Sequence, residues 1–195
     1  MKLKNTYYLL RHGETNCHVK MPGFLYPKWL ATGPDIRLTD KGKDQIRKSA
    51  KELKNKKIDF IYSSDFFRTR QSSKIISDFL NIKINLDKKL RDINLGTYYG
   101  RKKEEFYKDF PLDNVKERFA KKPTKGESWN ELRKRVKSFL EEIEKRHQDK
   151  NILIVSHGDT LWMLGGIIRK MTNKEMIEEI LGKGYIKMGE LRKIN

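Results

Sequence analysis

Short apolar segments alternate with helical patterns along this chain, and this alternation limits the fold more than any other feature of the sequence. The clearest apolar segment is Asn151–Ser156, which leads directly into His157 and Gly158. Such short apolar runs are typical of strands buried on both faces. Strands that alternate with helices favour a mostly parallel sheet covered by helices on both sides. We therefore expect an α/β fold, a three-layer α/β/α sandwich with a mostly parallel central sheet, in a single domain over residues 1–195.

Periodicity and turn residues place the individual elements. We expect strands at residues 6–10, 58–64, 82–87, 151–156 and 184–191, the last at an edge of the sheet. We expect helices over 38–54, 65–80 and 128–147, after Gly158 and after Thr172, and one or two short helices within 102–119. Expected helix caps are Thr39 or Asp40, Asp65, Ser128 and Thr172. Glycine and proline predict a long loop over residues 13–37 and an irregular segment over 91–100.

The chain is strongly basic, with 44 Lys and Arg against 26 Asp and Glu and a formal net charge of +18. This charge raises the hypothesis of nucleic-acid binding. The basic residues are spread along the chain, which favours solvated helix faces instead, so we do not expect a nucleic-acid partner. The single cysteine, Cys17, indicates a reducing compartment. No apolar run reaches the length of a signal-peptide core or a membrane span, so we expect a cytoplasmic protein without a membrane partner.

Two of the predicted strands end in the same way. Arg11, His12 and a glycine follow the first, and His157 and Gly158 follow the fourth. Each glycine would let the backbone turn sharply beside a site. In open α/β sheets ligands bind outside the carboxyl ends of the strands, so both histidines should meet there, together with Arg68 from the start of a helix.

This cluster suits a phosphoryl group. Arginine forks bind phosphate, and the helix that starts at Gly158 adds backbone N–H groups for an anion. A neutral imidazole can attack phosphorus, and a second, protonated histidine can stabilise the transferring oxygens. A carboxylic acid would then protonate the leaving alcohol, and Asp92 is the candidate. Flanking arginines repel a cation, so we expect neither a metal nor a cofactor.

Each candidate also has an explanation without function. A single histidine after a strand is often only a hinge or surface residue, but two of them followed by glycine favour a site. Arg68 fits a helix-face charge as well as a phosphate contact. Asp92 fits an Asx-type turn about as well as a proton donor. The loop position of His18 does not decide its role.

Six motifs together carry a family resemblance. The sequence Leu10-Arg11-His12-Gly13-Glu14-Thr15 is followed, in order, by motifs at residues 35–45, 63–73, 90–96, 126–128 and 155–159. With these motifs the chain resembles the histidine phosphatase superfamily, also called the phosphoglycerate mutase-like family. The resemblance implies a phosphoglycerate mutase-like fold and a phosphohistidine intermediate on His12. It also implies that Arg11, Arg68 and His157 complete the phosphate pocket.

The chain departs from the family pattern at three places. Asp92 stands where the family usually has glutamate as proton donor, so the acid is one methylene shorter. Many members have an asparagine at the position of His18, and here Asn16 lies two residues earlier. Either residue can substitute in the phosphate contact, or the contact is lost. The aromatic loop over residues 21–34, with Phe24, Tyr26 and Trp29, is either a lid over the site or a surface packing segment.

The resemblance implies a metal-independent phosphatase that hydrolyses a small phosphorylated metabolite. The alternative is a phosphoglycerate mutase, although the short 101–125 segment offers little to enclose the site. A third hypothesis is a non-catalytic or RNA-binding module on the same scaffold, motivated by the net charge and by Asp92. The C-terminal edge strand is open to pairing in a homodimer.

Overall fold

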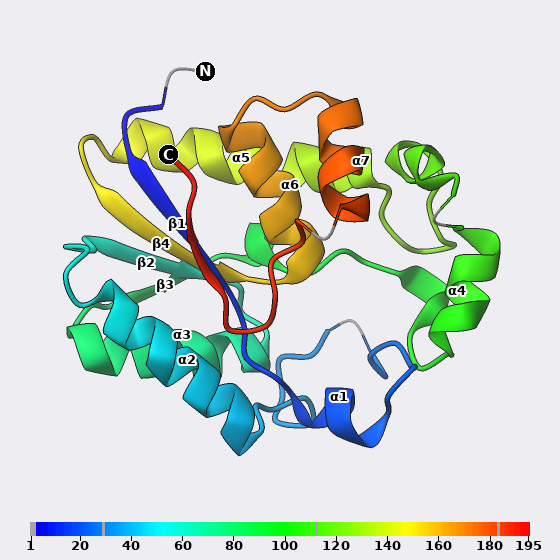
Figure 1. The fold of residues 1–195 in the computed structure, drawn as a ribbon, viewed down its shortest axis with the longest axis horizontal. Helices are drawn as coiled ribbons and strands as arrows, with labels where there is room; N and C mark the ends of the chain where they lie inside the picture. The colour runs from blue at the N-terminus through cyan, green and yellow to red at the C-terminus, as the bar shows by residue number, and fades with distance from the viewer. Residues whose placement is uncertain (1–2, 29, 112, 183) are drawn as a thin grey trace.

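Five strands form one sheet in the order β3-β2-β4-β1-β5 (Figure 1). In a computed structural model that describes residues 3–28, 30–111, 113–182 and 184–195, they span Thr6–Arg11 (β1), Phe60–Ser63 (β2), Ile84–Leu86 (β3), Asn151–Ser156 (β4) and Leu191–Lys193 (β5). The pairs β1–β4, β2–β4 and β2–β3 are parallel, and β5 runs antiparallel beside β1. The expected α/β fold with a mostly parallel sheet is confirmed.

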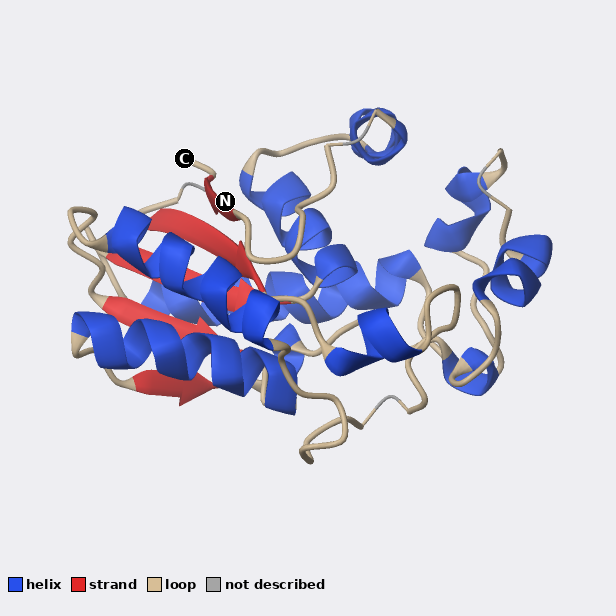
Figure 2. Cartoon of the chain, turned by 60° about the horizontal axis from the view of Figure 1, so that its bottom comes forward, coloured by secondary structure: helices blue, strands red, loops and turns tan. Residues whose placement is uncertain are grey.

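Helices cover both faces of the sheet, which confirms the three layers (Figures 1 and 2). On one face lie α2 (Asp40–Leu53) and α3 (Phe67–Leu80), and on the other lie α5 (Trp129–Arg146), α6 (Gly158–Ile168) and α7 (Asn173–Leu181). Along β1, Tyr7 and Leu9 join the core under α5 and α6, whereas Tyr8 and Leu10 join the core beside α2 and α3. This burial on both faces explains why the strands are apolar without alternation.

Three of the four expected helix caps are confirmed. The side chains of Thr39, Ser128 and Thr172 each accept a hydrogen bond from a backbone N–H in the first turn of the following helix. The expectation for Asp65 is wrong, because its carboxylate instead accepts two hydrogen bonds from Arg91, at 2.7 and 2.6 Å. The N-cap position of α3 is held by Phe66.

The buried face of α3 is apolar only in the second half of the helix, where Ile76 is buried and Ile75 and Leu80 pack against the core. Phe79 is 47% exposed, whereas the first half of the helix buries Arg68, Thr69, Ser72 and Ser73. These residues face the ends of β1 and β2, and the hydroxyls of Thr69 and Ser72 form hydrogen bonds there. The start of α3 therefore packs against a polar site and not against the core.

Two segments take a different form from the one expected. The predicted loop over 13–37 contains a short helix, α1 (Asn16–Lys20). Its five residues are too few to show a helical period in the sequence. The predicted strand over 184–191 is displaced to β5, because the chain turns at Gly189 with φ +71° before it can pair with β1. Before that turn, Ile186 is buried in the core.

The segments between β3 and α5 lie outside the carboxyl end of the sheet (Figure 1). They comprise the 3-10 turns η1 (Lys88–Leu90), η2 (Gly96–Tyr98) and η3 (Val115–Phe119) and the helix α4 (Lys103–Asp109). This confirms the irregular segment and the short helices. Within the described ranges, no helix is both long and apolar enough to cross a membrane.

Candidate active site

The two histidines of the predicted cluster meet at the carboxyl ends of neighbouring strands. Because β1 pairs with β4 so that Arg11 is opposite Ser156, the next residues, His12 and His157, leave the sheet side by side. Their ring centroids lie 5.3 Å apart, and both side chains are buried. The parallel register thus brings together residues that are far apart in the chain.

The glycines after these histidines serve close packing and not a sharp turn. Neither Gly13 nor Gly158 has a left-handed φ. A Cβ on Gly13 would lie 2.2 Å from the carbonyl oxygen of Gly42, and one on Gly158 would lie 2.2 Å from the hydroxyl of Tyr185. The sequence analysis expected these glycines to allow sharp turns, and that expectation is wrong. Glycine is needed because α2 packs closely against Gly13 and the C-terminal segment packs closely against Gly158. Gly158 also lines the cavity described below.

His12 is held as a neutral imidazole with a defined tautomer. Its Nδ1 lies 2.8 Å from the carbonyl oxygen of Gly13, which can only accept, so the proton is on Nδ1. Nε2 accepts a hydrogen bond of 3.3 Å from Nε of Arg68. Burial, and then the charges of Arg68 and Arg11, lower the pKa of His12 well below its ordinary value. The lone pair on Nε2 is therefore the nucleophilic atom that the site offers.

Both predicted arginines present N–H groups to this site. Arg68 is 1% exposed and its guanidinium stacks 4.3 Å from the ring centroid of Tyr26. Arg11 donates from Nη1 to the carbonyl oxygen of Ile186 at 2.9 Å. Nη1 of Arg68 and Nε of Arg11 are buried without a hydrogen-bond partner in the described part of the chain. Buried donors of this kind fit an anion with several acceptor oxygens, such as a phosphoryl group.

Asp92 lies at the same place. Its Oδ2 is 3.2 Å from Nη2 of Arg68 and 3.7 Å from Nδ1 of His157, and its Oδ1 accepts a hydrogen bond from the backbone N–H of Ile93. Burial raises the pKa of Asp92 to about 6, against the opposing effect of Arg68. A carboxyl group with this pKa carries a proton in mildly acidic solution, as a general acid requires.

His157 differs from the sequence expectation in its charge. Nε2 lies 3.0 Å from Oγ of Ser64, and Nδ1 is buried without a hydrogen-bond partner among the described residues. Burial and the charge of Arg68 lower its pKa well below the ordinary value, so the imidazole is neutral here and not protonated. A phosphate dianion beside it would favour the protonated form, because an opposite charge raises the pKa of a histidine.

The structure separates the two candidates for the third phosphate contact. Asn16 bonds the loop beyond α1, from Nδ2 to the carbonyl oxygen of Asp35 and from the N–H of Arg37 to Oδ1, and it does not line the cavity. Both ends of the Asn16 amide are thus engaged by the loop, which favours His18 for the predicted contact. His18 does line the cavity, with its ring centroid 6.1 Å from that of His12.

Local contacts determine which nitrogen of His18 can donate. Nδ1 accepts from the backbone N–H of Thr15 at 3.0 Å, so the proton of the neutral ring lies on Nε2, 3.2 Å from the Tyr26 hydroxyl. Burial lowers the pKa of His18 to about 4, and Arg11 adds to the shift. His18 therefore offers one N–H donor, as the amide of an asparagine would.

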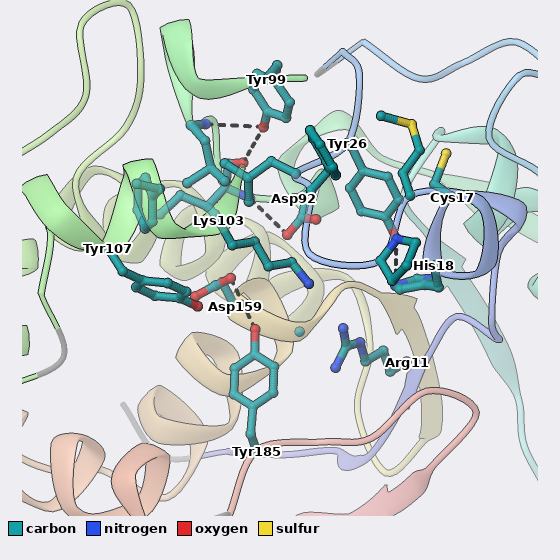
Figure 3. A pocket seen from close by; sticks show the side chains of 18 of the residues that line it. Arg11, Cys17, His18, Tyr26, Asp92, Tyr99, Lys103, Tyr107, Asp159 and Tyr185 are labelled. Atoms are coloured by element: carbon teal, nitrogen blue, oxygen red, sulfur yellow. Dashed lines mark hydrogen bonds between the residues drawn. The ribbon is translucent and has the colours of Figure 1, made fainter. Parts of the chain in front are cut away.

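A cavity of about 430 Å³ adjoins this cluster and is lined by its members Arg11, His18 and Asp92 (Figure 3). The buried side chains of His12, Arg68 and His157 lie behind these lining residues. One wall is the first part of the aromatic loop, residues 21–26, and the opposite wall comes from α4 and from Tyr185. Phe24 and Tyr26 of the aromatic loop line the cavity, and the role of this loop as a lid stays a prediction. Trp29 lies outside the described residues.

Residues 7–184 match the model of the histidine phosphatase superfamily, branch 1. This chain belongs to the histidine phosphatase superfamily. A putative phosphoserine phosphatase 2 of Hydrogenobacter thermophilus is 35% identical over 157 residues, which cover 79% of this chain and 73% of that protein. A probable phosphoglycerate mutase GpmB of Escherichia coli is 32% identical, covering 80% and 71% of the two chains. The solved mycobacterial glucosyl-3-phosphoglycerate phosphatase shares the fold, with a TM-score of 0.78 at 20% identity over 96% of this chain and 88% of that one.

In this member of the histidine phosphatase superfamily, Arg135 of α5 anchors the segment that carries Asp92. The sequence analysis did not identify Arg135 as a site residue. Its guanidinium donates to the backbone carbonyl oxygens of Lys89, Arg91 and Asp92 at 2.8, 2.9 and 3.2 Å. It also forms a two-pronged ion pair with Glu127, at 2.9 and 2.7 Å. The helical pattern showed only a charged residue on a long helix, so no signal in the sequence pointed to this contact.

Substituting Arg135 with methionine is expected to lower kcat/KM for alkyl phosphates by about tenfold and for p-nitrophenyl phosphate by less, because loosening the segment misplaces the proton donor. Activity assays on both substrates measure this difference. Lys134→Met, an exposed change on the same helix, is the matched control. Equal losses on both substrates would show that Arg135 supports the fold and not the placement of the acid.

Proposed function

We propose that this protein is a metal-independent phosphatase that hydrolyses a small phosphomonoester through a phosphohistidine on His12. The observation that carries the proposal is the Nε2 lone pair of a buried, neutral His12 beside two arginines with unsatisfied N–H groups. A nucleophile and an anion pocket are thereby combined at one point. The cavity of about 430 Å³ suits a small leaving group.

The proposed reaction has two steps. Arg11, Arg68 and His157 bind the phosphoryl oxygens, and Nε2 of His12 attacks phosphorus while the ester P–O bond breaks. Asp92 gives its proton to the departing alcohol oxygen. Asp92, now a carboxylate, then takes a proton from water, and the hydroxide oxygen attacks phosphorus as the N–P bond breaks. Phosphate leaves, and His12 and protonated Asp92 are restored.

The relatives support both a phosphatase and the alternative. One relative is named as a putative phosphoserine phosphatase and another as a probable phosphoglycerate mutase. A mutase would share the first step, but it would return the phosphoryl group to a sugar acid before water takes it. Two residues that line the cavity, Phe24 and Tyr107, are 37% and 42% exposed. Access of water favours hydrolysis.

The test is turnover of p-nitrophenyl phosphate in excess EDTA, together with phosphorus NMR of phosphoglycerate with and without a bisphosphoglycerate primer. We expect p-nitrophenol and free phosphate in the presence of the chelator, and no exchange of phosphate between the two positions of phosphoglycerate. Primer-dependent exchange without phosphate release would establish the mutase instead. Activity that EDTA abolishes would overturn the metal-independent mechanism.

The sequence expectations about location and partners remain part of this proposal. A cytoplasmic location is supported by the single cysteine, and a homodimer through the C-terminal edge of the sheet stays a prediction. The RNA-binding hypothesis rests on the net charge of +18. It would be favoured by a salt-sensitive gel shift with RNA that survives His12→Ala, and we expect no such shift.

A further inference from the structure

Two unpaired charges of opposite sign face the cavity beyond the phosphate-binding residues. Lys103 is the first residue of α4, and Asp159 lies in the first turn of α6. Figure 3 shows the Lys103 ammonium pointing into the cavity, with Asp159 and Arg11 nearby. Within the described ranges neither Lys103 nor Asp159 belongs to an ion pair, although the neighbouring charged residues Arg91 and Arg135 are paired. The cavity therefore offers the cation of Lys103 and the anion of Asp159 to the same space. Arg118 also lines it, and its guanidinium lies over the rings of Phe106 and Trp129.

Asp159 lies within electrostatic reach of both ends of the cavity. Its Oδ2 accepts a hydrogen bond of 3.0 Å from the hydroxyl of Tyr185, which leaves Oδ1 for another donor. Its charge contributes to the raised pKa of Asp92 at the reacting end and of Tyr107 on the α4 wall. Asp159 therefore lies near Asp92 and near Tyr107 in the lining of one cavity.

Lys103 reaches the same region from α4. Its positive charge contributes to the lowered pKa of His18, which places it within electrostatic reach of the phosphate end. Its backbone N–H is anchored on the carbonyl oxygen of Gly23 at 2.8 Å, so the start of α4 is tied to the aromatic loop. The ammonium group is thus carried by a fixed backbone, while its four-carbon stem can adjust to a ligand.

These charges discriminate between classes of leaving group. A carboxylate alone would meet Lys103 but would also face the like charge of Asp159, and an ammonium alone would meet Asp159 but face Lys103. A neutral alcohol would leave both charges without a partner. A group that bears a carboxylate and an ammonium on one carbon can pair with Lys103 and Asp159 at the same time. This is the arrangement of an α-amino acid.

We propose that Lys103 and Asp159 form a subsite for a zwitterionic leaving group, and that the substrate is an O-phosphorylated amino acid. Lys103 receives its α-carboxylate and Asp159 its α-ammonium, while the phosphoryl group lies on His12, Arg11 and Arg68. This inference rests on the proposed phosphatase function and names its substrate class. Two relatives, at 35% and 32% identity, are named as phosphoserine phosphatases, which agrees with this class.

Four substrates separate the two charges. O-phosphoserine bears both, phosphoglycerate the carboxylate, phosphoethanolamine the ammonium, and glycerol phosphate neither. We expect the highest kcat/KM for O-phosphoserine. Asp159→Asn should lower the ratio of kcat/KM for O-phosphoserine over phosphoglycerate by about 10- to 100-fold, and Lys103→Met should lower the ratio of O-phosphoserine over phosphoethanolamine by a similar factor.

Ratios are used because a change near Asp92 alters the rate on every substrate, and such a change cancels. The matched controls are Lys108→Met and Asp113→Asn, which remove the same charges from positions that do not line the cavity. We expect both controls to leave both ratios unchanged. Unchanged ratios in Asp159→Asn and Lys103→Met, with p-nitrophenyl phosphate still hydrolysed, would overturn the subsite and leave the phosphatase proposal intact.

A binding experiment covers the case in which no substrate is hydrolysed, which would contradict the phosphatase proposal itself. Titration calorimetry of O-phosphoserine into His12→Ala measures the Kd without turnover. Adding Asp159→Asn or Lys103→Met should raise this Kd by about tenfold or more, whereas adding Asp113→Asn should not. O-phosphoserine that binds no more tightly than glycerol phosphate would show that the subsite does not recognise the zwitterion.

Discussion

Replacing His12 with alanine is expected to lower kcat on p-nitrophenyl phosphate by about ten-thousand-fold or more, because the substitution removes the atom that accepts the phosphoryl group. His18 cannot take its place through Nδ1, since that nitrogen already accepts the backbone N–H of Thr15. Rapid quenching of the wild type with labelled substrate should trap an acid-labile, base-stable phosphoenzyme, and His12→Ala should trap none.

The matched control for this experiment is His147→Ala. His147 ends α5, far from the site, and its Nε2 lies 2.8 Å from the hydroxyl of Tyr62. We expect this variant to keep its turnover and to lose some thermal stability. A His12→Ala protein that remains folded and still forms the phosphoenzyme would assign the nucleophile to another residue.

Replacing Asp92 with asparagine is expected to have the second-largest effect, and the effect should depend on the leaving group. Alkyl phosphates should lose about 100- to 10,000-fold in kcat, because an alkoxide cannot leave without a proton. p-Nitrophenyl phosphate should lose much less, because p-nitrophenolate leaves unprotonated. The slope of log kcat against leaving-group pKa, measured over a series of phosphomonoesters, should therefore become steeper in Asp92→Asn than in the wild type.

The raised pKa of Asp92 also predicts a pH dependence. The carboxyl must be protonated to act as the acid, and its pKa is raised to about 6 by burial. Wild-type activity on alkyl phosphates should therefore be full at mildly acidic pH and fall as the pH rises through about 6, while Asp92→Asn should lack this fall. Bound substrate adds negative charge near Asp92, so in kcat the fall should lie at higher pH than in kcat/KM.

Asp92→Glu provides the conservative comparison, because it keeps the carboxyl and adds the methylene that most members of the family have. We expect it to retain the leaving-group dependence of the wild type, with a change in rate that reflects the new position of the acid. Equal losses of Asp92→Asn on all leaving groups would show that Asp92 acts through its contact with Arg68 and not as the proton donor.

Sequence reasoning succeeded where a short segment carries its own signal. The apolar runs that end in His12 and His157 marked buried parallel strands, and the rule that ligands bind at their carboxyl ends placed both histidines together. The caps at Thr39, Ser128 and Thr172 are similarly local, because each bonds a backbone N–H within the following turn. These features depend on residues within a few positions of one another.

Sequence reasoning failed where two distant segments compete for one contact. Both Asn16 and His18 fitted the third phosphate contact, and the loop at Asp35 and Arg37 engages Asn16. Asp65 had the residue type of a helix cap, and Arg91 engages its carboxylate instead. In each case the stronger interaction comes from a residue more than fifteen positions away, so local propensity could not decide it.

The sequence by itself determined the order of strands and helices along the chain, the strand exits that carry the two histidines, and the gathering of these histidines with Arg11 and Arg68. Only the tertiary structure decided the charge and tautomer of His12, the protonation range of Asp92 and the placement of Lys103 and Asp159 in the lining of one cavity. The reason is physical. Residue type and period are local properties, whereas desolvation and Coulomb interactions depend on which side chains the packed fold brings within a few ångströms of each other.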